Sequence, residues 1–535
     1  MQTAHLDLFA WRNLPPKDEW PDLRFTLPEL QYPDWLNCGV ELLDRHVMEG
    51  RGGRIAVRAP GVAWTYAELL DKANRIARVL AEDMGVVPGG RVLLRGFNSP
   101  MMIACWFAVM KMGAIAVATM PLLRARELRV IIDKAQVNAC LCDQAIAAEL
   151  DEAIPGHQSL RGRVRYWNLA DPTSLEGRMA RKDGTFANVN TSATDVALIA
   201  FTSGSTGGPK GTLHFHRDVM AATELNTRYL VKATADDIFC GSPPLAFTFG
   251  LGGLVLFPFR VGASTLLLER AAPDVLLKAI QEHKATVCFT APTAYRAMLA
   301  SVGRHDISSL RLCVSAGEHL PKSTWEAWHK ATGIKIIDGL GATEMLHIFI
   351  ASEGDGIRPG ATGKVLPGYE ARIVDDQMRD MPNGTIGRLA VRGPTGCRYL
   401  ADPRQANYVK QGWNLTGDAY LRDADGYYWY QARTDDMIVS AGYNISGPEV
   451  EEALMEHAAI RECAIVGAPD EDRGTVVKAF VVLKEGAKAE ARELQDFVKA
   501  RIAPYKYPRQ VEFLDALPRT ESGKLQRFRL RQPPA

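Results

Sequence analysis

The sequence predicts an α/β protein that has a large N-terminal domain of layered α/β sheets, a β-rich subdomain and a small α+β C-terminal domain. Two observations predict this fold class. Short apolar runs typical of buried strands recur between amphipathic helical patterns, and such alternation produces largely parallel sheets. The chain has 535 residues, which is more than one hydrophobic core usually supports, so at least two domains are expected.

The N-terminal half contains the clearest secondary-structure signals. Thr65 and Glu68 have the spacing of a capping box, and apolar residues follow at helical intervals up to Leu80. The apolar stretch 101–123 is interrupted by Lys111 and Pro121, so we interpret it as a buried helix leading into a strand and not as a membrane span. Strands are predicted at residues 91–94, 138–141, 196–201, 287–289 and 311–314.

Turn signals mark the parts of the second half. A Gly/Asp-rich stretch at 351–363 and the Pro-Asn-Gly turn at 382–384 indicate a β-rich subdomain over about 355–432. Residues 446–449 (Ser-Gly-Pro-Glu) have the pattern of a helix start, and Val477 to Leu483 that of a strand. We therefore expect an N-terminal domain over 1–434 and a C-terminal domain over 435–535.

Composition limits the possible partners. Hydrophobic residues make up 47% of the chain, and 63 basic side chains balance 62 acidic ones, so no basic excess suggests nucleic-acid binding. Residues 1–14 lack the basic and apolar runs of an export signal. The nine cysteines are too few for a disulfide scaffold, and no second pair or histidine completes a zinc site beside Cys140 and Cys142. We expect a cytoplasmic monomer or homodimer, with no membrane or nucleic-acid partner, in which His214 and His216 are packing residues.

Residues 202–211 (Thr-Ser-Gly-Ser-Thr-Gly-Gly-Pro-Lys-Gly) directly follow the predicted strand 196–201. Glycines let backbone N–H groups approach phosphate oxygens, hydroxyls donate hydrogen bonds and the lysine supplies a countercharge. The segment is not a Walker A loop, because Pro209 precedes Lys210 and Gly211 follows it. A Gly/Ser linker is the alternative, but a linker has no reason to follow a buried strand or to contain Pro-Lys-Gly.

The order of residues 202–211 resembles the signature of the adenylate-forming enzymes, the acyl- and aryl-CoA synthetases and their relatives. The family's other motifs are matched in family order at residues 315–318, 338–344, 416–418, 433–436 and 518–524. Any one of these residues, such as Glu344 or Lys524, would by itself be read as a surface charge. Their joint order supports the resemblance, which covers essentially the whole chain.

The resemblance implies that ATP, Mg²⁺ and coenzyme A are bound. It implies that Thr343 touches the α-phosphate, that Glu344 holds Mg²⁺ and that Lys524 contacts the carboxylate and the α-phosphate during adenylation. It also implies that the small domain is a mobile lid, which rotates about Asp435 and brings Gly442 to the thiol channel. The residues expected to bind the nucleotide are Thr202, Ser203, Gly204, Ser205, Thr206, Gly207, Lys210, Gly317, Glu318, Asp338, Gly339, Asp418 and Arg433.

The acid that is activated is predicted from two further segments. Residues 245–252 and 345–349 resemble the acyl-pocket walls of benzoate-type ligases, and residues 100–126 look most like 2-aminobenzoate-CoA ligases. Thr248 and Phe249 stand where alanine and tyrosine would be expected for plain benzoate, so the ring substituent stays open. The alternative is that Phe247 and Phe249 are core residues and His347 is a structural histidine. The residues expected to contact the substrate are Phe247, Thr248, Phe249, Gly250, Ala316, Leu340, Gly341 and His347.

These parts together predict an ATP-dependent aryl-CoA ligase that acts on a small aromatic carboxylic acid of the benzoate or 2-aminobenzoate type. AMP and pyrophosphate would be its other products. Two alternatives stay open. An aryl-AMP ligase would load a carrier protein in place of coenzyme A, and a nucleotide-binding sensor would perform no catalysis.

Overall fold

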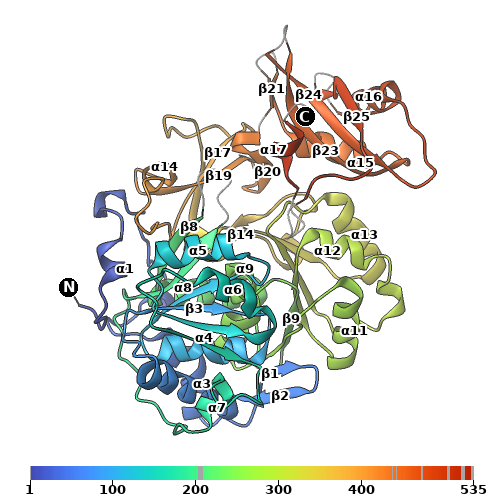
Figure 1. Cartoon of the computed structure of the whole chain (residues 1–535). Coiled ribbons are helices and arrows are strands. Elements are labelled where there is room, and N and C mark those ends of the chain that lie inside the picture. The colour runs from blue at the N-terminus through green and yellow to red at the C-terminus, as the bar shows by residue number, and fades with distance from the viewer. Residues whose placement is uncertain are drawn as a thin grey trace.

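The computed structural model describes residues 2–202, 209–436, 438–440, 443–470, 474–502, 506–519 and 525–531. The chain forms a large domain from its N-terminal part and a small domain from its C-terminal part, which lies above the large one in Figure 1. The predicted α/β class and the division into a large and a small domain are confirmed. Within the described ranges, no helix is long and apolar enough to cross a membrane.

The first large sheet has six strands, and all neighbours are parallel except the last pair. That pair, β7 and β8, is an antiparallel hairpin in which Thr202 lies opposite Lys210. The hairpin therefore brings the two ends of the phosphate-loop segment together. In spatial order the strands are β6 (Gly162–Tyr166), β5 (Ala139–Asp143), β3 (Arg91–Arg95), β4 (Ile115–Thr119), β7 (Val196–Thr202) and β8 (Lys210–Phe215).

The second large sheet has nine strands with a parallel centre. The neighbours β12 and β13 pair in parallel, with Ala316 opposite Gly339, so the segments that follow them leave the sheet at the same edge. In spatial order the strands are β15 (Lys364–Val365), β14 (Ile348–Ala351), β13 (Ile336–Gly341), β12 (Leu312–Ala316), β11 (Val287–Thr290), β9 (Ile238–Gly241), β10 (Ser264–Leu266), β1 (Ile55–Ala59) and β2 (Val62–Thr65).

Helices cover both large sheets in layers (Figure 1). The central layer contains α4 (Pro100–Lys111), all of whose residues are buried, together with α3 (Tyr66–Arg78) and α8 (His216–Leu225). The outer layers are α5 (Ala125–Ala135) and α6 (Ala147–Ala153) on the six-stranded sheet, and α11 (Pro273–His283), α12 (Pro292–Met298) and α13 (Lys322–Thr332) on the nine-stranded sheet. The remaining short helices of the large domain are α1 (Phe9–Arg12), α2 (Arg45–Met48), α7 (Leu175–Met179), α9 (Thr248–Leu251), α10 (Phe257–Val261) and α14 (Gln405–Tyr408).

The β-rich part is a five-stranded antiparallel sheet between the layers and the small domain. It contains β16 (Glu370–Val374), β17 (Gly387–Arg392), β18 (Val409–Lys410), β19 (Trp413–Arg422) and β20 (Tyr428–Arg433). The small domain contains β21 (Ile438–Ser440), β22 (Tyr443–Ile445), β23 (Ile460–Asp470), β24 (Gly474–Leu483), β25 (Gln510–Phe513), α15 (Gly447–Met455), α16 (Ala491–Lys499) and α17 (Arg527–Leu530).

Several local predictions are confirmed. The side chain of Thr65 accepts from the backbone of Glu68 at the start of α3, and the Glu68 side chain accepts from the backbone of Thr65. The stretch 101–123 is the buried helix α4 followed by β4. His214 and His216 are fully buried on β8 and at the start of α8. One boundary differs: β15, at residues 364 and 365, joins the nine-stranded sheet, so the five-stranded sheet begins only at Glu370.

The first part of the chain runs along the large domain and connects two of its sheets. Asp7 forms an ion pair with the buried Arg91 of β3, with 2.6 Å between the charged atoms. Asp22 contacts the β-rich part, since its N–H donates to the carbonyl of Gly412 (2.8 Å) and its carboxylate pairs with Arg392 (3.2 Å). The segment therefore holds the five-stranded sheet against the six-stranded one.

Candidate active site

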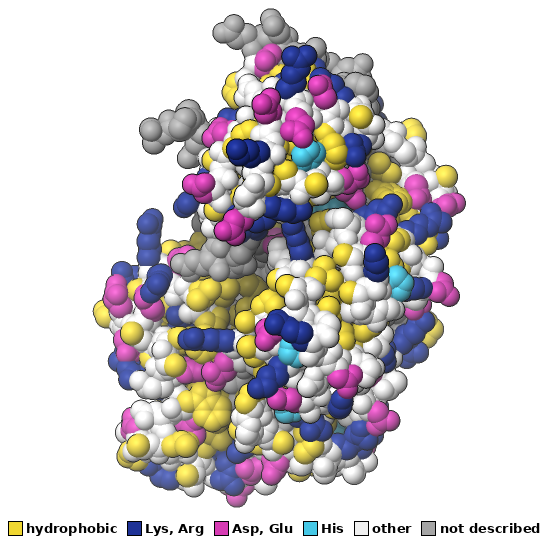
Figure 2. All heavy atoms as spheres, turned by 90° about the vertical axis from the view of Figure 1, so that its right-hand side faces the viewer, with side chains coloured by type: hydrophobic (Ala, Val, Ile, Leu, Met, Phe, Trp, Pro, Cys, Tyr) yellow, Lys and Arg dark blue, Asp and Glu magenta, His cyan; other side chains and the backbone are white. Residues whose placement is uncertain are grey.

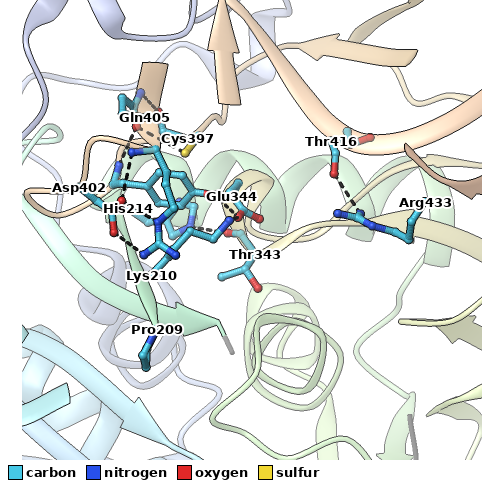
Figure 3. Close-up of polar contacts among 12 residues, drawn as sticks. Pro209, Lys210, His214, Thr343, Glu344, Cys397, Asp402, Gln405, Thr416 and Arg433 are labelled. Atoms are coloured by element: carbon cyan, nitrogen blue, oxygen red, sulfur yellow. Dashed lines mark hydrogen bonds and ion pairs between the residues drawn. The ribbon is translucent and has the colours of Figure 1, made fainter. Parts of the chain in front are cut away.

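The predicted motifs meet where β8 lies close to the segments that follow β12 and β13. Nε2 of His214 on β8 lies 2.7 Å from the carbonyl oxygen of Thr343, just beyond β13. Burial lowers the pKa of His214 to about 4, so the ring is neutral at pH 7 and donates to this carbonyl. The contact joins the two large sheets at the candidate site (Figure 3).

Two residues, Thr202 and Lys210, form the base of the phosphate-loop segment. Thr202 has a buried Oγ1 with no hydrogen-bond partner in the described part of the chain. Nζ of Lys210 lies 3.9 Å from Oε1 of Glu344 and 4.9 Å from the centre of the Tyr399 ring. The Thr202 hydroxyl is thus a buried donor without a partner among the described residues, and the Lys210 ammonium is only loosely paired with Glu344. The predicted contacts Ser203, Gly204, Ser205, Thr206 and Gly207 lie outside the described residues.

Glu344 lies in a short 3₁₀ turn, Thr343–Met345, and is only 8% exposed. The hydroxyl of Tyr399 donates to its Oε1 at 2.5 Å. No hydrogen bond to Oε2 occurs among the contacts of the described residues. The carboxylate therefore has one oxygen held by the protein and one available.

Tyr399 and Asp402 belong to the site, although no motif predicted them. Asp402 pairs with Lys134 of α5 (2.6 Å) and with Arg404 (2.6 Å), and these cations lower the pKa of the Asp402 carboxyl, the Arg404 contact most. Lys134 also donates to the carbonyl of Pro209 at 3.2 Å, beside the phosphate-loop segment. The sequence signal was weak: Arg398 and Tyr399 are polar residues between apolar neighbours, outside every family motif quoted above.

A second group of predicted nucleotide residues lies on the five-stranded sheet, opposite the Lys210 and Glu344 cluster (Figure 3). Asp418 and Arg433 are partners across β19 and β20, and they form an ion pair with 2.8 Å between the charged atoms. Arg433 also donates to the carbonyl of Thr416 at 3.1 Å. Burial raises the pKa of Asp418 in spite of this partner, so a polar ligand that donates to this carboxylate would relieve its desolvation.

The remaining nucleotide residues line the ends of β12 and β13. Gly317 has φ of +88° and nothing within 4 Å of the place where a Cβ would lie, so a ligand could approach its backbone closely. Asp338 is buried, and burial raises its pKa well above the usual range. Gly339 is closely packed, because a Cβ there would meet the side chain of Ile348 at 2.4 Å; its contact with the nucleotide stays a prediction. Glu318 is half-buried beside Gly317.

His347 lies in an aromatic enclosure beside this edge. Its ring centre is 4.6 Å from that of Phe257, 5.7 Å from that of Phe249 and 6.4 Å from that of Phe289. Nε2 makes a long contact of 3.4 Å with the Phe249 carbonyl, and the buried Nδ1 has no partner within the described ranges. Burial lowers the pKa of His347 to about 3. The site therefore offers a neutral imidazole beside aromatic rings, which suits a flat apolar ligand that has a polar substituent.

The other predicted substrate residues do not all lie beside His347. Phe247 is 39% exposed and joins none of the ring contacts around His347; with Thr248 it lines a narrow pocket beside Trp106 and Ala200. Gly250 has its missing Cβ directed at the carbonyl of Pro244, 2.1 Å away, so it is a packing position. Ala316, Leu340 and Gly341 lie at the ends of β12 and β13, near the enclosure.

Two predicted residues of the small domain cannot be placed. Lys524 and Gly442 lie outside the described residues. Asp435 lies in the turn Thr434–Asp436, between the last strand of the five-stranded sheet and β21. Figure 2 shows that the surface is hollowed between the small domain above and the large domain below.

The family follows from sequence comparison. Residues 43–399 match the model of the AMP-binding enzymes, and residues 449–524 match that of the AMP-binding enzyme C-terminal domain. The chain belongs to the AMP-binding enzymes. The resemblance read from the motifs is thereby confirmed.

Named relatives agree in length as well as in sequence. A benzoate-CoA ligase of Thauera aromatica is 34% identical over 95% of this chain and 98% of its own. A 4-hydroxybenzoate-CoA/benzoate-CoA ligase of Rhodopseudomonas palustris is also 34% identical, over 93% of this chain and 94% of its own. The crystal structure of the anthranilate CoA ligase AuaEII with anthranoyl-AMP superposes with a TM-score of 0.89 at 35% identity, over 94% of this chain and 98% of that one.

Proposed function

We propose that the protein is an AMP-forming aryl-CoA ligase that activates a small aromatic carboxylic acid with ATP and transfers it to coenzyme A. The observation that carries this proposal is the enclosure of His347 by Phe249, Phe257 and Phe289, three residues beyond Glu344 in the chain. An aromatic acid seated there would direct its carboxylate toward the cluster of Lys210 and Glu344. The relatives that act on benzoate and anthranilate support the same substrate class.

The reaction has two displacements. In the first, a carboxylate oxygen attacks the α-phosphorus of ATP, and the bond from that phosphorus to the pyrophosphate oxygen breaks. In the second, the thiol of coenzyme A attacks the acyl carbon, the thiol proton is lost and AMP leaves. Adenylation is needed because a free carboxylate is a poor electrophile, whereas AMP is a good leaving group.

The side chains of the site suit the first displacement. Lys210 and the hydroxyls of Thr202 and Thr343 would stabilise the negative charge on the phosphoryl oxygens, with Lys524 added from the small domain. One preorganised contact of this kind typically contributes roughly 3 kcal/mol to the transition state. Asp418 would accept hydrogen bonds from the ribose hydroxyls, while its ion pair with Arg433 holds the carboxylate in place.

A magnesium ion fits the donor set. In the described part of the chain no cluster of three or more His, Cys, Asp or Glu side chains could hold a metal ion. Mg²⁺ is usually held by one or two protein carboxylates together with substrate phosphates and water, and Glu344 has one oxygen available. Bound there with ATP, the ion would neutralise charge on the phosphates.

We propose that the small domain serves both steps of the reaction. The last strand of the five-stranded sheet ends at Arg433, and β21 begins at Ile438, so we place the domain boundary at 434 and 435 and the hinge at Asp435. In this proposal Lys524 serves adenylation and Gly442 leaves room for the thiol in the second step.

Within the aromatic acids we propose benzoate or 2-aminobenzoate. The rings of Phe249, Phe257 and Phe289 pack around His347 in the buried core, and the unpaired Nδ1 of His347 could bond an ortho amino group or the carboxylate. A straight-chain acid of similar apolar area would have to extend into that core.

The test is ATP–pyrophosphate exchange with benzoate, 2-aminobenzoate, 2-hydroxybenzoate and octanoate, followed by product mass with coenzyme A. Exchange with the aromatic acids together with an aryl-CoA product supports the proposal. Octanoate turned over as well as the aromatic acids would contradict the substrate class. Exchange without an aryl-CoA product, but with loading of a phosphopantetheinyl carrier protein, would favour a carrier-loading ligase, and no exchange with any acid would favour a sensor.

A further inference from the structure

We propose that Tyr399 is the residue that positions Glu344 for a cation, by keeping this carboxylate from pairing closely with Lys210. This inference rests on the proposed function, because it concerns the metal that would accompany ATP. The contacts that carry it are the hydroxyl bond of Tyr399 to Oε1 of Glu344 (2.5 Å) and the wider separation of Lys210 from that same oxygen (3.9 Å).

Three hydrogen bonds fix the backbone of Tyr399 and its two neighbours. The N–H of Leu213 donates to the carbonyl of Arg398, and the N–H of Leu400 donates to the carbonyl of Gly211, each at 2.8 Å. These bonds add the segment to the edge of β8, with Tyr399 opposite Thr212. The side-chain oxygen of Gln405 accepts from the N–H of Tyr399 at 2.9 Å. The backbone of Tyr399 therefore cannot shift without breaking these hydrogen bonds.

The residue before Tyr399 anchors the segment from the other face. Because side chains alternate along an extended segment, Arg398 points away from the site. Its guanidinium forms a fully buried ion pair with Asp218 and lies 4.0 Å from the centre of the Phe215 ring. Breaking a buried pair of this kind is strongly unfavourable, so Tyr399 starts from a rigid backbone.

The ring of Tyr399 also accounts for the position of Lys210. The ammonium lies over the ring face, 4.9 Å from its centre, within the range of a cation–π contact. The ring face of Tyr399 thus contacts the Lys210 ammonium, and the Tyr399 hydroxyl binds the Glu344 carboxylate. Without the hydroxyl, Glu344 would be free to close on Lys210, and a metal ion would then have to break a direct ion pair.

The experiment measures the affinity for ATP by calorimetry, with Mg²⁺ and with EDTA, and takes the ratio of the two Kd values as the gain from the metal. Tyr399→Phe keeps the ring and removes only the hydroxyl, so folding is expected and thermal unfolding checks it. We expect the gain from Mg²⁺ to fall about tenfold, the change expected from a lost charge-assisted hydrogen bond, and the affinity in EDTA to fall by less than that.

Two further variants distinguish a positioning role of Tyr399 from a general loss of stability. Lys210→Met added to Tyr399→Phe removes the competing cation, so we expect most of the gain from Mg²⁺ to return relative to Lys210→Met alone. Tyr66→Phe is the matched control: it removes a buried hydroxyl that donates to the Ala263 carbonyl at 2.8 Å and contacts neither Glu344 nor Lys210 in the described part of the chain, and it should leave the gain unchanged.

The outcomes are distinct from those that test the function. An unchanged gain from Mg²⁺ in Tyr399→Phe, or no recovery in the double variant, overturns the positioning role. A wild-type protein that binds no ATP under either condition would instead contradict the proposed function.

Discussion

Gly252 and His347 occupy adjoining space: a Cβ on Gly252 would lie 2.2 Å from Cδ2 of the His347 ring. No side chain larger than hydrogen can stand at position 252 while His347 keeps its place among Phe249, Phe257 and Phe289. The position of His347 among these rings therefore depends on the absence of a side chain at residue 252.

Gly252→Ala should displace His347 and lower kcat/KM for the aromatic acid at least tenfold, while the affinity for ATP stays within about twofold. Steady-state kinetics and calorimetry measure the two quantities. Gly303→Ala is the control, because nothing lies within 4 Å of its Cβ position. Equal loss of both quantities in Gly252→Ala would show a general folding defect.

His347→Ala tests what the imidazole contacts. Removal of one hydrogen bond should cost roughly 1 to 3 kcal/mol. If His347 bonds an ortho substituent, the preference for 2-aminobenzoate over benzoate narrows; if it bonds the carboxylate, both acids lose equally. The measurement is kcat/KM for the two acids, and unchanged values for both would return His347 to the role of a structural histidine.

Lys134→Met should raise the KM for ATP about tenfold and leave the KM for the aromatic acid unchanged. The substitution removes the contacts of Nζ with Asp402 (2.6 Å) and with the Pro209 carbonyl (3.2 Å), which support the end of the phosphate-loop segment. Lys278→Met is the matched control, since Lys278 forms only a loose surface pair with Glu282 at 3.7 Å. An ATP KM that responds equally to both substitutions would remove Lys134 from the site.

Lys524→Ala and Gly442→Trp should block opposite halves of the reaction. The lysine variant should lose adenylation by at least a hundredfold and still convert supplied aryl-adenylate to aryl-CoA. The tryptophan variant should retain pyrophosphate exchange and fail to form aryl-CoA, because its side chain fills the thiol channel. Assays of the two half-reactions measure this, and loss of both halves in either variant would argue against a rotating small domain.

Stability should fall as the pH is lowered from about 6.5 to about 4. Burial lowers the pKa of His214 and His319 to about 4, and of His216 and His347 to about 3. In this window the unfolded chain takes up protons that the folded chain cannot, which costs up to about 1.4 kcal/mol per histidine for each pH unit. Urea unfolding at several pH values measures the slope. In His216→Gln the slope should decrease by the equivalent of one proton, and an unchanged slope would show that His216 is protonated in the folded protein.

Local features of the fold were predictable because their causes are local. The capping box at Thr65 and the buried helix at 101–123 are encoded within a few residues, and the structure has both. The meeting of segments 315–318 and 338–344 follows from parallel pairing of consecutive strands. Tyr399 could not be found in this way, because its place depends on pairing with Thr212, which lies far away in the sequence.

The positions of Phe247 and Phe249 show a second limit of prediction from sequence. Both were expected to wall one pocket; Phe249 lies beside His347, whereas Phe247 lines a narrow pocket with Thr248 and is partly exposed. The two flank the start of α9 (Thr248–Leu251), a helix of one turn that continues as a π-helical segment, Gly252–Leu256. The directions of side chains in so short an element depend on its packing, which sequence periodicity does not encode.

The chain before residue 43 lies outside the family match, yet it supports the site. Gln405, whose side chain accepts from the Tyr399 N–H, donates in turn to the carbonyl of Glu19 at 2.8 Å, and the N–H of Ala401 donates to the carbonyl of Asn13 at 3.0 Å. Removal of this leading segment would break these hydrogen bonds and loosen the backbone on both sides of Tyr399. Residues 13–22 should therefore be kept with the catalytic module in any engineering of this enzyme.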